Sequence, residues 1–165
     1  MAEAKQLPAG IDPQNALIVE TTPGTIVIKL HSDIAPGHAE RLKLLAREQY
    51  YDNVPFHRVI DGFMAQTGDG KYGNGTGGSS YPDLKAEFSD RPFVRGTVGM
   101  ARARSPNSAN SQFFIMFDDG DFLNGQYTVI GEVVTGMDVV DKIKRGEPPA
   151  DPDRIVRMQV AADVK

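Results

Sequence analysis

The chain alternates between short strand-like runs and long glycine-rich connections, and this rhythm restricts its possible folds more than any other feature. Each run carries β-branched or aromatic residues, often in alternation with polar ones. The runs span residues 16–19, 25–30, 56–60, 63–67, 97–101, 112–117, 127–134 and 154–160. Many short strands with few helices predict a mainly β protein, and a β-barrel rather than a parallel α/β sheet.

Two segments have helical spacing instead. Residues 36–48 carry apolar side chains at helical intervals, with charged residues elsewhere around the axis. Pro36 suits the first helical turn, where its missing N–H removes no hydrogen bond. We expect a second helix over residues 137–145, which would end at Gly146 because glycine is common just after a helix C-terminus.

Length and composition fit one globular domain. The 165 residues suggest a loose leader over residues 1–14, rich in Pro, Ala and Gly, and a single domain over 15–165. Lys and Arg total 18 against 22 Asp and Glu, for a net charge of -4, and no basic block occurs. We therefore expect neither nucleic acid nor a membrane as a partner.

The chain contains no cysteine, which excludes disulfides, thiol catalysis and zinc–thiolate sites. It has no apolar segment typical of a secretory signal or long enough to span a membrane. We expect a cytoplasmic protein.

Residues 68–73 match the pattern G-x-G-x-x-G, which binds dinucleotides only where a helix begins at once. The following residues 74–79 are too rich in glycine to continue as a helix, so we interpret the stretch as a long loop and expect no cofactor. Metal-site and nucleophile motifs are also missing from the sequence. We expect His31 and His38 on the surface and His57 packed near a strand, with no metal bound.

A cation and amides are interleaved with Phe and Met in two segments, residues 56–69 and 99–116. In two strands joined around residues 61–62, alternation would bring Arg58, Phe63 and Gln66 towards one face. Two interpretations are open from the residues alone. The apolar side chains either line a binding site, or they are core residues and Arg58 forms an ion pair.

Strand alternation turns Phe113 away from Phe114, and we expect Phe113 in the core. The same alternation turns His57 away from Arg58, which favours a structural role for His57 over proton transfer.

The strings FHRVIDGFMAQTGD, NGTGG, GTVGMARA, SQFFIMF and DFLNGQYTVIGEV occur in this order and resemble the cyclophilin family. The resemblance runs from about residue 16 to the C-terminus, and the combination of FHR, GFM-Q and SQFF is highly specific. It implies a closed eight-stranded antiparallel β-barrel capped by two α-helices, with a proline-binding groove on its outer wall. It also implies peptidyl-prolyl cis–trans isomerase activity without a cofactor.

The resemblance maps the catalytic positions onto Arg58 and Gln66. It maps the substrate-binding positions onto Phe63, Met64, Gly75, Ala101, Arg102, Ala103, Gln112, Phe114, Phe122, Leu123 and Tyr127. The implied partners are proline-containing peptides and unfolded protein clients. Nothing in the sequence suggests an obligate interface, so we expect a monomer.

The sequence departs from the pattern of the best-known cyclosporin receptors of the family at three places. Phe122 stands where those proteins carry tryptophan, so an indole N–H donor is missing and we expect weakened cyclosporin binding. Tyr127 replaces histidine, and the loop over residues 104–110 is one residue longer.

The implied reaction needs no nucleophile, because rotation about an Xaa-Pro bond makes and breaks no covalent bond. In the twisted transition state the prolyl nitrogen accepts a hydrogen bond, and Arg58 would donate it. Two alternatives remain: a noncatalytic proline-peptide binding module on the same fold, and a general chaperone that shields apolar segments.

Overall fold

The first two strands form a hairpin that begins the sheet. The computed structural model describes residues 7–164, in which β1 covers Ala16–Thr21 and β2 covers Gly24–Leu30. The strands pair from Ala16 with Lys29 to Thr21 with Gly24. The Thr21 hydroxyl donates a hydrogen bond to the Gly24 carbonyl and closes the turn. The hairpin expected from the sequence is confirmed.

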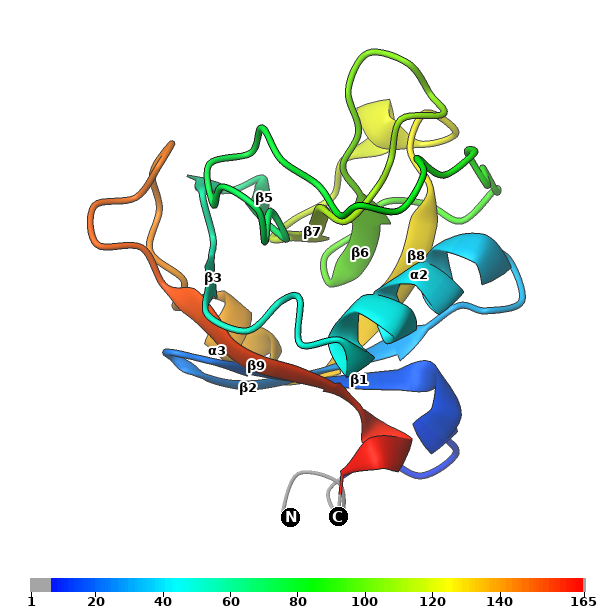
Figure 1. The fold of residues 1–165 in the computed structure, drawn as a ribbon, viewed down its shortest axis with the longest axis horizontal. Coiled ribbons are helices and arrows are strands. Elements are labelled where there is room, and N and C mark those ends of the chain that lie inside the picture. Colours follow the sequence, from blue (N-terminus) through cyan, green and yellow to red (C-terminus); the bar gives the residue numbers. More distant parts are fainter. Residues whose placement is uncertain (1–6, 165) are drawn as a thin grey trace.

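All the strands of the described chain join one antiparallel sheet of nine strands, which curls around an interior (Figure 1). Their order across the sheet is β3-β9-β1-β2-β8-β6-β7-β5-β4. The remaining strands are β3 (Val54–Pro55), β4 (Arg58–Ile60), β5 (Met64–Thr67), β6 (Thr97–Met100), β7 (Phe113–Met116), β8 (Val129–Thr135) and β9 (Arg154–Val160).

The prediction of a closed eight-stranded barrel is wrong in two respects. A ninth strand is present, because the two residues of β3 pair with β9. The sheet is also open: β3 and β4 are its two edges, and no ladder joins them within residues 7–164. They are consecutive in the chain, so the edges approach each other without pairing. Single hydrogen bonds hold this corner, from the Phe56 N–H to the Asp153 carbonyl and from the Thr67 hydroxyl to the Pro55 carbonyl.

Two α-helices of the described residues 7–164 pack against the sheet. Helix α2 spans Pro36–Arg47, close to the predicted range, and its buried apolar side chains enter the interior. Helix α3 spans only Met137–Val140, so the prediction of a helix to residue 145 is wrong. After Val140 the hydrogen bonding changes to the 3-10 type. The N–H groups of residues 142 and 143 donate to the carbonyls of the residues three positions earlier.

Short 3-10 turns complete the secondary structure. They are η1 (Pro13–Asn15), η2 (Asp121–Leu123) and η3 (Ala161–Asp163). No helix within residues 7–164 has the length and apolar character needed to cross a membrane.

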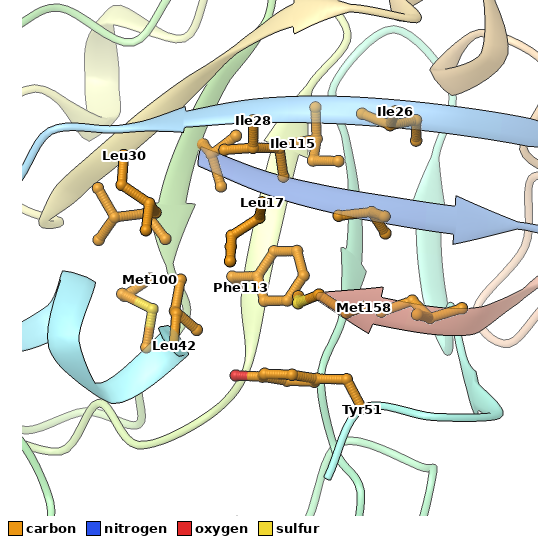
Figure 2. Close-up of a cluster of buried hydrophobic side chains, with 14 of the residues drawn as sticks. Leu17, Ile26, Ile28, Leu30, Leu42, Tyr51, Met100, Phe113, Ile115 and Met158 are labelled. Atoms are coloured by element: carbon orange, nitrogen blue, oxygen red, sulfur yellow. The ribbon is translucent and has the colours of Figure 1, made fainter. Parts of the chain in front are cut away.

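The interior is filled by side chains from opposite walls of the sheet and from α2 (Figure 2). Val140 of α3 belongs to the same core. Phe113 is at its centre, with its ring edge-on to the Tyr51 ring at 5.6 Å between centroids. The Tyr51 hydroxyl donates a hydrogen bond of 2.7 Å to the Ser111 carbonyl, so its buried polar atom is satisfied. The prediction that Phe113 belongs to the core is confirmed.

A second apolar layer covers the outside of the first hairpin. Leu7 and Ile11 pack against Ile18 and Val27 there, while residues 1–6 lie outside the described part of the chain. The division into a leader over 1–14 and a domain over 15–165 stays a prediction.

We expect Phe113→Ala to lower the free energy of unfolding by about 3–5 kcal/mol, because it removes a fully buried ring and leaves a cavity. Urea unfolding followed by circular dichroism measures the change. Val156→Ala on the exposed side of β9 is the control, with an expected change of less than about 0.5 kcal/mol. A loss below about 1 kcal/mol for Phe113→Ala would contradict this account of the core.

Candidate active site

The outer face of strands β5, β6 and β7 carries a separate apolar cluster. Met64 and Phe114 are buried there beside Leu123, with Phe63 packed against them. Neighbouring residues of a strand point to opposite faces, so Phe114 faces this cluster while Phe113 faces the interior. Gly99 is opposite Phe114 in the ladder, and a Cβ at this glycine would lie 2.7 Å from the Phe114 ring. The absence of a side chain at Gly99 therefore makes room for the floor of the site.

A row of polar side chains runs beside this floor. Arg58 on β4 is paired with Gln66 on β5, and its Nη1 donates to Gln66 Oε1 at 3.4 Å. Gln66 Nε2 donates in turn to Gln112 Oε1 at 3.0 Å. Gln112 Nε2 donates to the carbonyls of Gly75 and Gly77, each at 2.9 Å. The row is thus a chain of hydrogen bonds from the guanidinium to a glycine-rich loop.

The apolar floor, together with Arg58 and Gln66 of the polar row, lines a groove of about 310 Å³. A second, more polar hollow of about 420 Å³ adjoins it and shares Gln66, Gly75, Ala101 and Arg102 with it. The groove is lined by His57, Arg58, Phe63, Met64, Gln66, Asn74, Gly75, Ala101, Arg102, Phe114, Leu123 and Tyr127.

Most of the residues expected at the site from the sequence meet in this groove. Ala103 and Gln112 line the adjoining hollow instead. Phe122 lines neither space; it is 69% exposed, and its ring lies 5.4 Å from that of Phe63. Tyr127 packs edge-on against Phe114, and the Arg102 guanidinium lies 4.5 Å above the Tyr127 ring.

The glycine-rich loop over residues 70–78 is held by one carboxylate. Asp69 is buried and accepts hydrogen bonds from the backbone N–H groups of Lys71, Tyr72, Asn74, Gly75 and Gly77. Burial raises the pKa of this carboxyl, but the backbone donors outweigh burial and lower the pKa to about 2. The loop that borders the groove is therefore organised around a fixed negative charge.

Two groove residues were missed in the sequence. His57 lines the groove although it was expected to be only structural, and Asn74 lies in the NGTGG string that carried Gly75. His57 is nearly buried, and burial lowers the pKa of its imidazole. Its direct proximity to Arg58 in the sequence was the available signal.

The expectation that His31 and His38 lie on the surface is wrong, since both are buried. His38 follows Pro36 in the first turn of α2, where its Nδ1 lies 2.5 Å from Glu87 Oε1. The same carboxylate accepts hydrogen bonds from the backbone N–H groups of Gly37 and His38, so Glu87 caps the N-terminus of the helix. Burial lowers the pKa of the His38 imidazole.

The described residues form no cluster of three His, Cys, Asp or Glu side chains that could hold a metal ion. The G-x-G-x-x-G stretch contains turns around Asp69 and no helix within residues 68–78. A dinucleotide pyrophosphate would thus meet a buried carboxylate there, in place of the N-terminus of a helix.

The groove combines a ring-sized apolar floor with amides and a guanidinium at its edge. This geometry suits the recognition of an apolar ring within a peptide. The sequence pattern of the family described as "Cyclophilin type peptidyl-prolyl cis-trans isomerase/CLD" matches residues 16–160. The chain belongs to this family, and it is a peptidyl-prolyl cis–trans isomerase.

Individual relatives agree with this assignment. The chain is 56% identical to the "Probable peptidyl-prolyl cis-trans isomerase" of Brucella suis, over 98% of this chain and 90% of that protein. It is 44% identical to "Peptidyl-prolyl cis-trans isomerase B" of Escherichia coli, over 75% and 80%.

Solved structures of cyclophilins are similar to this fold. A cyclophilin from Hirschia baltica matches with a TM-score of 0.87 and 30% identity, over 94% of this chain and 77% of that chain. A cyclophilin type isomerase from Cryptosporidium parvum, crystallised in the presence of the dipeptide Ala-Pro, matches with a TM-score of 0.81 and 28% identity. This match covers 88% of this chain and 98% of that chain.

We expect Asp69→Asn to destabilise the protein by about 2 kcal/mol at neutral pH, because the pKa of Asp69 is lower in the folded state than in the unfolded chain. The stabilisation is present above about pH 4 and is lost as the pH falls towards 2. In the variant, stability should therefore change less across this window. Urea unfolding between pH 2 and 7 measures the free energy of unfolding, with the substitution Asp119→Asn at an exposed position as control. Equal pH dependence of wild type and Asp69→Asn would contradict the prediction.

Proposed function

We propose that Arg58 is the catalytic residue and acts by hydrogen bonding to the prolyl nitrogen of the twisted peptide. The observation that carries this proposal is the position of Arg58 at the edge of the apolar floor, with one nitrogen held by Gln66. Twisting the peptide bond localises the nitrogen lone pair, which then accepts a hydrogen bond that the planar ground state cannot. The guanidinium therefore stabilises the transition state more than the substrate.

The proline ring of the substrate occupies the floor formed by Phe63, Met64, Phe114 and Leu123. The packing of these side chains in one cluster supports this role, as does the crystallisation of the related Cryptosporidium parvum isomerase in the presence of Ala-Pro. The twisted amide also has less charge separation than the planar one, so an apolar surface favours it relative to water. Gln66 orients Arg58, and the segment Ala101 to Ala103 lies beside the substrate backbone.

The energy required is compatible with a single charged donor and a desolvating pocket. The uncatalysed barrier is about 18–20 kcal/mol. A hundred-thousandfold acceleration requires about 7 kcal/mol. By analogy with an oxyanion-hole donor, one guanidinium contributes about 3–4 kcal/mol. The pocket and the positioning of the substrate backbone supply the remainder.

The substrates are Xaa-Pro bonds in flexible or unfolded chains, and the enzyme assists their folding. The groove is small, about 310 Å³, and open to solvent, which supports a broad choice of clients. The cytoplasmic location, the monomeric state and the absence of nucleic-acid and membrane partners stay predictions.

We expect Arg58→Ala to lower kcat/KM by about 10²–10³-fold, the loss typical of one preorganised donor to a transition state. Arg58→Lys should remain impaired, because an ammonium keeps the charge but lacks the planar fork. NMR exchange on a short Xaa-Pro peptide measures the rate, with unfolding curves to show that both variants are folded.

The two alternatives give different results in this experiment. A noncatalytic binding module would bind the peptide without accelerating its exchange in the wild type. A general chaperone would suppress aggregation equally well after Arg58→Ala. Wild-type exchange rates in a folded Arg58→Ala variant would overturn the proposed mechanism.

We expect Phe122→Trp to tighten cyclosporin binding about tenfold, because it adds an indole N–H at a largely exposed position beside Phe63. A new hydrogen bond of about 1.4 kcal/mol corresponds to this factor. Isothermal titration calorimetry measures the affinity, with Phe88→Trp at another exposed phenylalanine as control. An unchanged affinity would show that Phe122 does not limit cyclosporin binding.

A further inference from the structure

A carboxylate from a distant part of the chain contacts the catalytic arginine. Glu147 lies in the loop between α3 and β9, and its Oε1 accepts a hydrogen bond from Arg58 Nε at 3.3 Å. The two residues are 89 positions apart in the sequence. The motifs that identify the groove residues do not include this loop.

The backbone fixes the position of Glu147 beside Arg58. Val59, the residue after Arg58, exchanges two hydrogen bonds of 2.8 Å with Gly146, the residue before Glu147. This bridge aligns the loop with the edge strand β4, so that the side chains of Arg58 and Glu147 emerge as neighbours. The position of Glu147 is therefore set by main-chain hydrogen bonds as well as by its own ion pair.

Glycine is required at position 146. Its φ of 145° lies in the region that favours glycine, and a Cβ there would lie 2.5 Å from Pro149 Cα. The close turn into residues 147–149 depends on the absence of a side chain.

The other end of the loop is also anchored. The Lys144 N–H donates to Asp153 Oδ2 at 2.8 Å, and the Thr22 hydroxyl donates to Asp153 Oδ1 at 2.7 Å. The Asp153 carbonyl accepts the Phe56 N–H at 2.9 Å, two residues before Arg58. The segment that carries Glu147 is thus fastened to β4 through Gly146, and through Asp153 to the residues just before β4 and to the turn between β1 and β2.

The guanidinium of Arg58 consequently has two acceptors of different origin. Glu147 accepts from Nε, and Gln66 accepts from Nη1. Within residues 7–164, Nη2 has no hydrogen-bond partner. Two contacts on one planar group restrict its rotation, and Nη2 stays available for a substrate atom.

We infer that Glu147 is a positioning residue, which fixes the plane of the Arg58 guanidinium so that its free N–H groups face the groove. This inference rests on the proposed catalytic role of Arg58. An exposed ion pair contributes little to stability, and both side chains are about half exposed, so the effect of Glu147 falls on geometry. It should therefore appear in kcat rather than in KM or in the free energy of unfolding.

The test compares wild type, Glu147→Ala, Glu147→Gln and Arg58→Ala on an Xaa-Pro peptide at saturating and limiting concentration. We expect Glu147→Ala to lower kcat about fivefold with KM changed less than twofold. Glu147→Gln should recover kcat to within twofold of wild type, because an amide oxygen can still accept from Nε. The control is Glu20→Ala, which removes a similar exposed pair with Arg157 that does not line the groove and should leave kcat unchanged.

Two further measurements separate positioning from a general structural effect. In an Arg58→Ala background, Glu147→Ala should cause no further loss, because the carboxylate acts through the arginine. In NMR spectra, the Arg58 Nε–H signal, assigned by its loss in Arg58→Lys, should shift and broaden in Glu147→Ala but not in Glu20→Ala.

Wild-type kcat in Glu147→Ala, or additive losses in the double variant, would overturn the inference while leaving Arg58 as the catalytic residue. Wild-type kcat in Arg58→Ala would overturn the proposed function together with the inference.

Discussion

The register of strand β7 is the constraint on which both the core and the groove depend. Phe113 enters the interior and Phe114 enters the groove floor because adjacent residues of a strand face opposite sides. The strand is paired with β5 on one edge and with β6 on the other. A shift by one residue would exchange the two faces and expose a phenylalanine of the core. The same ladder hydrogen bonds therefore determine stability and the shape of the site.

The wall of the groove is held by hydrogen bonds without regular secondary structure. Gln112 binds the carbonyls of Gly75 and Gly77, while Asp69 binds N–H groups of the same two residues. Both the N–H and the carbonyl groups of these loop residues are thus hydrogen-bonded. The glycines adopt close turns that residues with a side chain would not. In the mechanism that we propose, such geometry matters because catalysis requires tighter binding of the twisted peptide than of the planar one.

The periodicity of apolar residues predicted the regular strands and helix α2. It failed where tertiary contacts determine the local structure. The alternation over residues 154–160 predicted β9 correctly, and the helical spacing after Pro36 predicted α2. Helix α3 ends early because the following residues form 3-10 hydrogen bonds, in which an N–H donates to the carbonyl three residues earlier. The spacing of apolar residues does not reveal this change. Strand β3 has two residues and therefore no period to detect. Whether a barrel closes depends on how β3 and β4 meet, which no local pattern encodes.

The same distinction separates the site residues that motifs could identify from those they could not. Arg58 lies within the string FHRVIDGFMAQTGD, so the motif was enough to predict its place in the groove. Glu147 meets Arg58 only through the bridge between Val59 and Gly146, which requires the folded chain. In the sequence, nothing distinguishes Glu147 from other glutamates in loops. In the structure it is about half exposed, and its ion pair adds little to stability. What distinguishes it is its partner, the guanidinium to which we assign the hydrogen bond with the prolyl nitrogen. In that proposal the contact matters through the geometry it imposes on Arg58 and not through its binding strength.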